Sequence, residues 1–247
     1  MDASLSIYKE LSRALARLKF AEPVDCVYDP LDYAWPAFAQ YVERYGRSPK
    51  EVVLVGMNPG PFGMVQTGVP FGEVSLVRDW LKIDAPIGRP ARCHPKRPVL
   101  GFECARSEVS GARLWGWAKA RFREPEIFFE RFFIAQYCPL AFMGESGVNI
   151  TPDKLAPEER ARLEALCDGA LSRFARRLAP KLVVGIGAYA AKRCALALAG
   201  SGISVGQVLH PSPASPAANR GWSDAAEAQL RALGVALPPQ NHHVLGP

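Results

Sequence analysis

Residues 51–63 constrain the fold more than any other part of this chain. They include four consecutive apolar residues at 52–55, which predict a strand buried in a sheet. Glycines and prolines follow at once and surround one amide side chain, Asn58. Glycine lets a backbone approach a ligand closely, and proline fixes the shape of a loop in advance. Because ligands bind at the carboxyl ends of strands in open α/β sheets, residues 56–63 predict a rigid pocket loop.

The remaining apolar patterns predict alternating strands and helices. Short apolar runs predict further strands at residues 132–137, 181–186 and 203–209. Apolar residues at helical spacing predict helices, at residues 4–20, 33–45, 75–83, 111–122, 157–178, 187–198 and 223–233. Pro36 is expected to interrupt the second of these helices. Strands that alternate with helices indicate an α/β protein whose parallel sheet is covered on both faces.

Parallel strands should also bring distant polar side chains together, because their carboxyl ends lie at one edge of the sheet. We therefore expect Asn58, residues 136–139, Gly187 and His210 to gather along this edge. The resulting cleft would hold the amides of Asn58 and Gln136 together with one imidazole.

Length and composition favour one domain. The chain has 247 residues, of which 49% are hydrophobic, and this is enough for a full core. Without a linker or a low-complexity break, we expect one domain over residues 1–247 with a loose tail at 239–247, although two small domains would also fit the length. The net charge of +6 suggests an anionic partner, but a basic protein without such a partner fits equally well.

Cysteine usage and the absence of targeting signals predict a cytoplasmic protein. The six cysteines include no C-x-x-C pair, and their scatter fits buried thiols in a reducing compartment. Spacing alone does not exclude a four-cysteine cluster. The first residues lack the pattern of a signal peptide, and no apolar stretch is long enough to span a membrane.

Common catalytic and cofactor motifs are missing. The loop at residues 56–63 is not a P-loop, and no G-x-G-x-x-G follows the first strand. No H-E-x-x-H or dense His/Cys cluster supports a catalytic zinc, and no G-x-S-x-G marks a nucleophile elbow. We therefore predict neither a metal nor a cofactor.

The polar residues of the expected cleft suit a reaction with a good leaving group. Asn58 can orient a water but cannot act as a strong base, and His210 can donate to an oxygen on which negative charge develops. Phe71 could stack on a planar heterocyclic base. Each also has a structural interpretation: a turn or cap for Asn58, a structural histidine for His210 and core packing for Phe71. Two stiff Pro/Gly loops with one polar group each favour the functional interpretation.

At these residues the sequence resembles a known family. Residues 56–64 and 66–73 closely resemble the first motif of the single-strand-selective monofunctional uracil-DNA glycosylases, and residues 210–213 resemble the second. Further similar segments lie between and after them, at residues 97–104, 106–111, 137–140, 146–147, 151–152, 216, 218–219 and 221–222. Motifs of this length and order are specific. The chain is therefore identified as a bacterial-type member of this family.

The resemblance implies a three-layer α/β/α sandwich with a central four-stranded parallel sheet and hydrolysis of the bond between uracil and deoxyribose. It implies that Asn58 orients the attacking water and that His210 bonds the uracil O2. The implied substrate-binding residues are Met57, Gly60, Met64, Phe71 and Gln136. The implied DNA-binding residues are Arg97, Pro211, Ser212, Pro213, Ala214, Ser215 and Asn219. The absence of a lysine from both motifs fits a monofunctional enzyme.

Two positions depart from the family pattern. Gln136 stands where the family has an asparagine that reads the uracil edge, and its extra methylene shifts the amide by about a bond length, which matters at a tolerance of roughly 0.5 Å. Ala214 stands where vertebrate members carry an arginine that enters the DNA, so the wedge should be weaker or supplied elsewhere. The basic loop at Arg89, Arg92, Lys96 and Arg97 is a candidate phosphate contact, although a solvated loop is an equal alternative.

The leading hypothesis is a monomeric DNA repair glycosylase that excises uracil and related oxidised or deaminated bases. It would act in the cytoplasm, associated with the nucleoid in a bacterium, on single- or double-stranded DNA. Two alternatives stay open from the residues. Gln136 leaves room for a non-catalytic module that binds damaged DNA, and a hydrolase of small nucleosides would use the same cleft.

Overall fold

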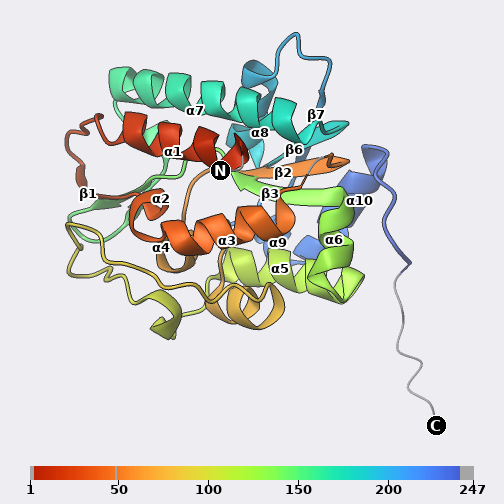
Figure 1. Cartoon of the computed structure of the whole chain (residues 1–247), viewed down its shortest axis with the longest axis horizontal. Coiled ribbons are helices and arrows are strands. Elements are labelled where there is room, and N and C mark those ends of the chain that lie inside the picture. Colours follow the sequence, from red (N-terminus) through yellow and green to blue (C-terminus); the bar gives the residue numbers. More distant parts are fainter. Residues whose placement is uncertain (1–2, 48, 240–247) are drawn as a thin grey trace.

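The central sheet of the molecule is parallel and four-stranded. The computed structural model describes residues 3–47 and 49–239 (Figure 1). The strand order is β3-β2-β6-β7, with β2 at Val52–Gly56, β3 at Phe132–Gln136, β6 at Leu182–Ile186 and β7 at Ser204–Val208. All neighbours are parallel, and Gly56 lies opposite Gln136 at the carboxyl edge. The four predicted strands and their common direction are confirmed.

Helices cover both faces of this sheet, as the three-layer prediction requires. Figure 1 shows α1, α7 and α8 in one layer and α5, α6 and α10 in the other. Their bounds are α1 Ala3–Leu15, α5 Val109–Phe122, α6 Pro125–Arg131, α7 Pro157–Leu178, α8 Ala188–Ala197 and α10 Trp222–Ala232. A helix α3 (Trp35–Tyr45) packs near the β3 edge, where the Tyr41 hydroxyl donates to the Ile134 carbonyl at 2.8 Å.

The expected interruption at Pro36 is wrong. Pro36 occupies the first turn of α3, which runs on unbroken to Tyr45. The first N–H groups of a helix have no carbonyl partner within it, so a proline there removes no hydrogen bond. The helical conformation is interrupted earlier, between α2 (Pro30–Tyr33) and α3.

A second sheet was not predicted. It is antiparallel and three-stranded, in the order β1-β4-β5, with β1 at Val24–Tyr28, β4 at Ala141–Gly144 and β5 at Asn149–Ile150. Its strands have only two to five residues, so they carry too little periodicity to be recognised. The β4–β5 hairpin follows β3 directly and so reaches the carboxyl edge of the main sheet.

Short helical turns lie in the connections between the longer elements. They are α4 Met64–Thr67, the π-helical turn η1 Leu76–Trp80, the 3-10 turns η2 Gly101–Glu103 and η3 Pro152–Lys154, and α9 Pro216–Asn219. The π-helical turn lies within the helix predicted at residues 75–83. The other four were not predicted, because three or four residues show no helical period.

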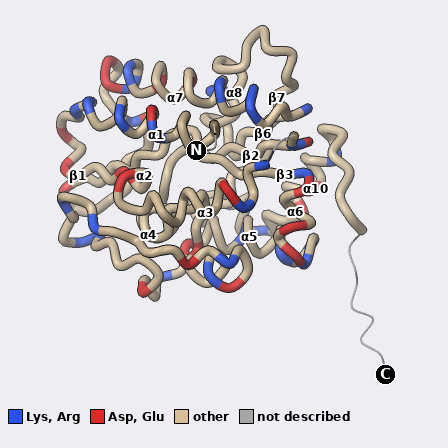
Figure 2. The backbone as a smooth tube through the Cα atoms, viewed as in Figure 1, with Lys and Arg blue, Asp and Glu red and all other residues tan. Residues whose placement is uncertain are grey.

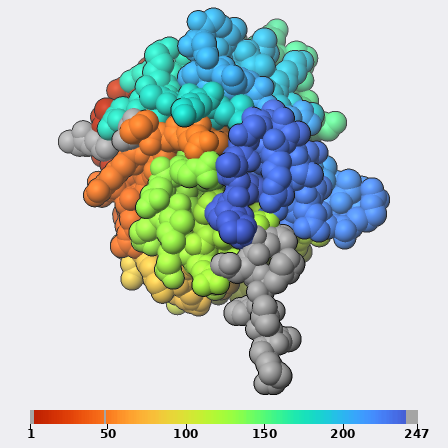
Figure 3. Space-filling view, turned by 90° about the vertical axis from the view of Figure 1, so that its right-hand side faces the viewer, coloured from red at the N-terminus to blue at the C-terminus, as the bar shows by residue number. Residues whose placement is uncertain are grey.

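The segment after α10 packs back on the α5–α6 layer. Arg131 donates to the Ala236 carbonyl at 2.8 Å and Arg121 donates to the Pro238 carbonyl at 3.0 Å. Figure 3 shows this blue segment lying against the green segment of α5 and α6. The predicted loose tail lies outside the described residues, except for residue 239. Within the described chain, no helix has the length and apolar character needed to cross a membrane.

Candidate active site

A cavity of about 590 Å³ opens at the carboxyl edge of the parallel sheet. Its walls come from the loop after β2, the start of α5, the β3 and β5 ends and the loop after β7. The predicted site residues that line it are Met57, Asn58, Gly60, Met64, Phe71, Gln136, His210, Ser212, Pro213, Ala214 and Ser215. The structure thus brings together most of the residues that the sequence placed in one cleft.

Asn58 presents an acceptor to this cavity. Its amide nitrogen lies 3.4 Å from the carbonyl oxygens of Pro59 and Leu140, so the donor side of the amide faces the protein. Among the described residues, none donates to the side-chain oxygen, Oδ1. This oxygen can therefore accept from a water in the cavity, while the amide remains too weak a base to deprotonate that water fully.

His210 presents a donor. Its Nδ1 accepts the backbone N–H of Ser212 at 3.1 Å, which leaves the ring hydrogen on Nε2 in the neutral imidazole. Burial lowers the pKa of His210, so the ring is neutral at pH 7. Gly187, with φ +90°, allows the ring to lie close to the end of β6, because a Cβ there would stand 3.2 Å from the His210 Cβ. A neutral N–H donor is thus fixed at the cavity wall.

Phe71 lies beside His210, and its backbone is held in an unusual conformation. The two ring centroids are 6.1 Å apart with planes at 43°. Phe71 has φ +53°, a left-handed conformation that costs a bulky residue roughly 1–3 kcal/mol. The indole N–H of Trp115 donates to the Pro70 carbonyl at 3.1 Å and helps to hold this turn. The surrounding packing therefore fixes the ring as a preformed stacking surface.

Gln136 reaches the cavity from the end of β3 with an unsatisfied acceptor. Its Oε1 is buried and accepts from no described residue. The oxygen lies against the Cα of Gly56, where a Cβ would collide with it and with the Phe71 ring. A buried amide oxygen without a partner is costly, and the side chain that carries it forms part of the cavity wall.

Four lining residues were missed by the sequence reasoning: Glu108, Ser110, Asn149 and Thr151. Glu108 caps α5, where its carboxylate accepts the N–H groups of Ser110, at 3.0 Å, and of Gly111. Burial raises the pKa of this carboxyl. A cap signal at the start of α5 could have placed Glu108, but nothing local indicates that α5 begins at the cavity. Asn149 begins β5 and Thr151 follows it directly, so both depend on the β4–β5 hairpin of the unpredicted sheet.

The arrangement can bind a planar base and stabilise negative charge on it without a metal ligand set. Among the described residues, no group of three or more His, Cys, Asp or Glu side chains could hold a metal ion. The cavity combines one stacking ring, one neutral N–H donor and two amide side chains. No lysine lines it, so the described wall offers no amine for a Schiff base.

Comparisons with known proteins identify the family. A sequence profile of the Uracil DNA glycosylase superfamily matches residues 43–233. The single-strand selective monofunctional uracil DNA glycosylase of Mus musculus is 50% identical over 227 residues, which cover 91% of this chain and 81% of the mouse protein. Its counterpart in Rattus norvegicus is 51% identical over 91% of this chain and 82% of the rat protein. The chain belongs to the single-strand-selective monofunctional uracil-DNA glycosylase family.

The fold is shared more widely than the sequence. The crystal structure of wild-type Pedobacter heparinus SMUG2 superimposes with a TM-score of 0.65 at 16% identity, covering 95% of this chain and 99% of that one. At this identity the likeness concerns the fold alone. The predicted uracil-DNA glycosylase-like architecture is confirmed.

The loop after β7 carries the second glycosylase motif, and its residues have different environments. Ser212, Pro213, Ala214 and Ser215 line the cavity mouth, whereas Pro211 is buried behind it. Asn219 does not line the cavity, and its amide nitrogen donates to the Pro213 carbonyl at 2.9 Å. The exposed Ala214 is small, so the loop presents no long side chain at this position.

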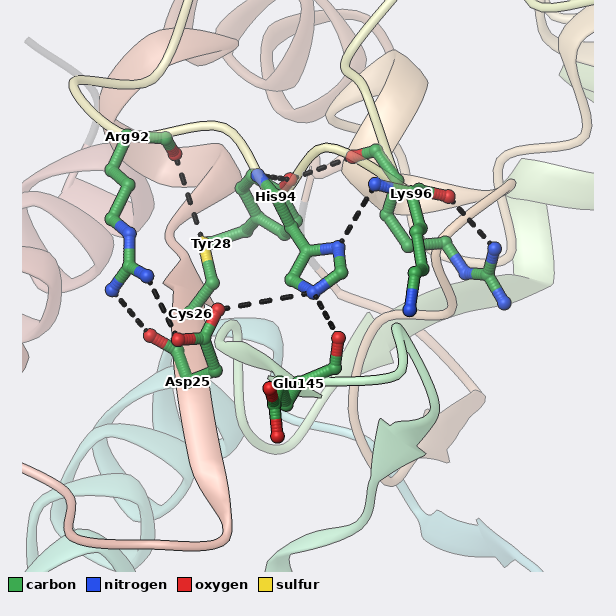
Figure 4. A network of polar contacts seen from close by, with 8 residues as sticks. Asp25, Cys26, Tyr28, Arg92, His94, Lys96 and Glu145 are labelled. Atoms are coloured by element: carbon green, nitrogen blue, oxygen red, sulfur yellow. Dashed lines mark hydrogen bonds and ion pairs between the residues drawn. The ribbon is translucent and has the colours of Figure 1, made fainter.

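Arg97 lies outside the cavity, on a loop fastened to the second sheet. Its guanidinium stands 5.4 Å from the centroid of the Phe62 ring, and that of Arg106 stands 4.1 Å from the same ring. Figure 4 shows how the buried His94 anchors this loop: Nε2 contacts the Glu145 carbonyl at 3.1 Å, and Nδ1 accepts the Lys96 N–H at 3.1 Å. The basic loop is therefore ordered and lies beside the β4–β5 hairpin.

Proposed function

We propose that this protein is a monofunctional DNA glycosylase that hydrolyses the N-glycosidic bond of uracil in DNA and leaves an abasic site. Membership of the glycosylase family supports the reaction class. The observation that carries the mechanism is the pairing, in one cavity, of the neutral His210 donor with the free Asn58 acceptor. Related oxidised or deaminated bases would be further substrates.

The reaction needs the base flipped out of the nucleic acid, since the cavity is recessed in the protein. Phe71 would stack on the ring, and Gln136 would read its edge through the amide. The C1′–N1 bond breaks, and its electron pair leaves with the base, whose O2 receives a hydrogen bond from His210 Nε2–H. Asn58 Oδ1 would hold a water whose oxygen bonds to C1′. The proton that this water loses passes to solvent.

His210 would act in this role as a neutral imidazole, since burial lowers its pKa. A preorganised N–H donor stabilises the negative charge that develops on O2 without carrying a charge itself. Its hydrogen is directed outward because Ser212 occupies the other ring nitrogen. The same residue pair therefore fixes both the tautomer and the aim of the donor.

Base discrimination would rest on Gln136. An amide side chain offers both an acceptor and a donor, and its acceptor would meet the N3–H of uracil once the side chain turns towards the base. The amide nitrogen of Gln136 can then donate to a carbonyl oxygen such as O4. Cytosine presents an acceptor at its third ring position, so a fixed Gln136 orientation disfavours it.

DNA would contact the surface around the cavity mouth. On one side of the cavity mouth, residues 211–215 would enter the DNA helix. On the other side, Lys96, Arg97 and Arg106 would contact DNA phosphates. Val148, which is 57% exposed at the hairpin tip, adds an apolar contact beside them. On the side shown in Figure 2, basic and acidic residues are interspersed. Local basic groups, more than the net charge, would therefore offset the few kcal/mol needed to flip a base.

Excision assays test the function directly. Purified protein in chelator at low salt should convert a single-stranded uracil oligonucleotide to an abasic product, with wild type compared against Asn58→Ala. Free deoxyuridine and a cytosine oligonucleotide serve as controls. Binding of uracil-DNA without base release would favour the non-catalytic module, and preferential cleavage of deoxyuridine would favour a nucleoside hydrolase.

We further propose that the protein is a bacterial-type member of the family. We also propose that it is a monomer and that it acts in the cytoplasm, near the nucleoid. The departures at Gln136 and Ala214 from the vertebrate pattern support the assignment to the bacterial type. All six cysteines are free thiols, which supports a reducing compartment. Light scattering with and without DNA tests the oligomeric state.

A further inference from the structure

The segment that carries His210 has little regular backbone support. It follows β7, and prolines at 211 and 213 remove two backbone donors from it. The His210 side chain receives its hydrogen bond from within this same segment, through Ser212. The orientation of the His210 ring therefore depends on the contacts that hold residues 211–213 in place.

Arg113 of α5 contacts this segment at several points. One guanidinium nitrogen donates to the Pro211 carbonyl at 3.0 Å and to the Ser212 carbonyl at 3.3 Å. The other terminal nitrogen donates to Asn219 Oδ1 at 2.8 Å. The Asn219 amide nitrogen in turn donates to the Pro213 carbonyl at 2.9 Å. Arg113 and Asn219 together thus bond three consecutive carbonyls after His210.

The opposite side of His210 is tied to a different helix. The indole N–H of Trp222 donates to the Leu209 carbonyl at 2.7 Å, and the Leu209 N–H donates to Gln229 Oε1 at 2.7 Å. Both partners belong to α10. His210 is therefore suspended between α10 on one side and the Arg113–Asn219 pair on the other.

Arg113 also connects the two walls of the cavity. It lies one turn after Ser110 on α5, and the cap residue of α5, Glu108, has a side chain that approaches Gly63 of the first loop. The guanidinium fork can bond several acceptors in one plane, which a lysine ammonium cannot reproduce in the same geometry. The site thus has a built connection between the loop after β2 and the loop after β7.

We propose that Arg113, relayed by Asn219, is a positioning residue that fixes the orientation of His210 in base excision. The inference rests on the proposed function. Arg113 does not line the cavity, so its effect passes through the loop. A donor misplaced by about 1 Å can cost about 100-fold in rate, and this sets the scale of the expected effect.

The test compares Arg113→Met, Arg113→Lys and Asn219→Ala with a matched control, Lys119→Met, which removes an exposed cation from the same helix. Single-turnover excision of uracil at saturating protein should slow by about 10- to 100-fold in Arg113→Met and by less in Arg113→Lys. Lys119→Met should stay within about twofold, as befits an exposed charge. The melting temperature of each variant checks that the fold persists.

A double-mutant cycle separates positioning from general damage. In a His210→Ala background, Arg113→Met should slow excision by less than about threefold, because the donor that it positions is already gone. In an Asn58→Ala background, it should keep its full effect. Equal losses in both backgrounds would overturn the proposal, as would wild-type rates in Arg113→Met.

Nitrogen NMR of the histidine rings provides a readout that does not need activity. Wild type should show His210 as a single neutral tautomer with hydrogen on Nε2, and Arg113→Met should show a tautomer mixture or exchange broadening. An unchanged His210 spectrum in Arg113→Met would contradict positioning even if the wild type released no uracil. Loss of wild-type excision alone would instead reject the proposed function.

Discussion

Ser212 lies two residues after His210 in the same loop, and its backbone N–H donates to Nδ1 of His210 at 3.1 Å. This bond exists only while Nδ1 is unprotonated, and burial lowers the pKa of the ring in the same direction. The catalytic donor and the loop conformation are therefore linked through one nitrogen atom.

The pH dependence of excision follows from this link. Burial lowers the pKa of His210 below its ordinary value of 6.5, so the ring is neutral above that pH. The neutral ring's contribution to the stability of the folded protein is lost as pH falls through the folded-state pKa. We expect the single-turnover rate to stay nearly constant from about pH 6.5 to 8.5 and to fall in acid, where protonation disrupts the Ser212 bond. A rate that declined with rising pH around neutrality would instead show a charged imidazole at work.

Asn58→Ala should remove the water-holding acceptor while leaving the stacking surface intact. We expect a loss of about 100-fold or more in single-turnover rate, on the scale of deleting one preorganised polar group in an active site. Affinity for uracil-DNA, measured by fluorescence anisotropy, should change by less than about threefold, since the DNA contacts lie elsewhere. A variant that kept half of the wild-type rate would remove Asn58 from the mechanism.

Gln136 should determine discrimination more than rate alone. Gln136→Leu removes both amide contacts, so kcat/KM for uracil should fall by about 10- to 100-fold, corresponding to about 1–3 kcal/mol. Gln136→Asn keeps the amide on a shorter stem and should stay within about tenfold. Steady-state assays on uracil oligonucleotides check both values. Full uracil activity in Gln136→Leu would mean that another group reads the base.

Gly56→Ala probes the positions of the Gln136 and Phe71 side chains without changing either residue. The new Cβ would collide with Gln136 Oε1 and stand 2.6 Å from the Phe71 ring, so both groups must shift. We expect kcat/KM to fall by more than about tenfold.

Gly116→Ala in α5 is the matched control for Gly56→Ala. A Cβ at Gly116 meets nothing within 4 Å, so this variant should keep activity and gain roughly 0.5–1 kcal/mol of stability in urea unfolding. Normal activity in Gly56→Ala would show that the Gln136–Phe71 arrangement tolerates displacement.

The parallel topology made the catalytic pair predictable. Asn58 and His210 are 152 residues apart in sequence, yet each follows a strand of the same parallel sheet, and strands of one direction end at one edge. Phe71 and Gln136 came from the family resemblance and from local position. The left-handed backbone of Phe71 could not be foreseen, because no glycine or asparagine marks it.

The residues that escaped prediction depend on long-range packing. Glu108 reaches the cavity only because α5 begins there, and Asn149 does so only through the second sheet. Arg113 is another such case. Its role follows from carbonyl acceptors almost 100 positions away, and backbone carbonyls leave no trace in a sequence. The family resemblance implied that Asn219 binds DNA. The structure adds that its side chain bonds Arg113 and the Pro213 carbonyl.

The position of β7 at the edge of the sheet has a consequence for how the molecule matures. β7 pairs only with β6 within the described sheet, and the His210 loop and α10 follow it in the last fifth of the chain. A nascent chain still missing this segment could bury much of its core, yet it would carry only half of its catalytic pair. Domains generally fold as units from the N-terminus during synthesis. A ribosome-bound fragment ending before residue 204 should therefore be inert towards DNA bases, because catalytic competence arises only once His210 and the segment around it are present.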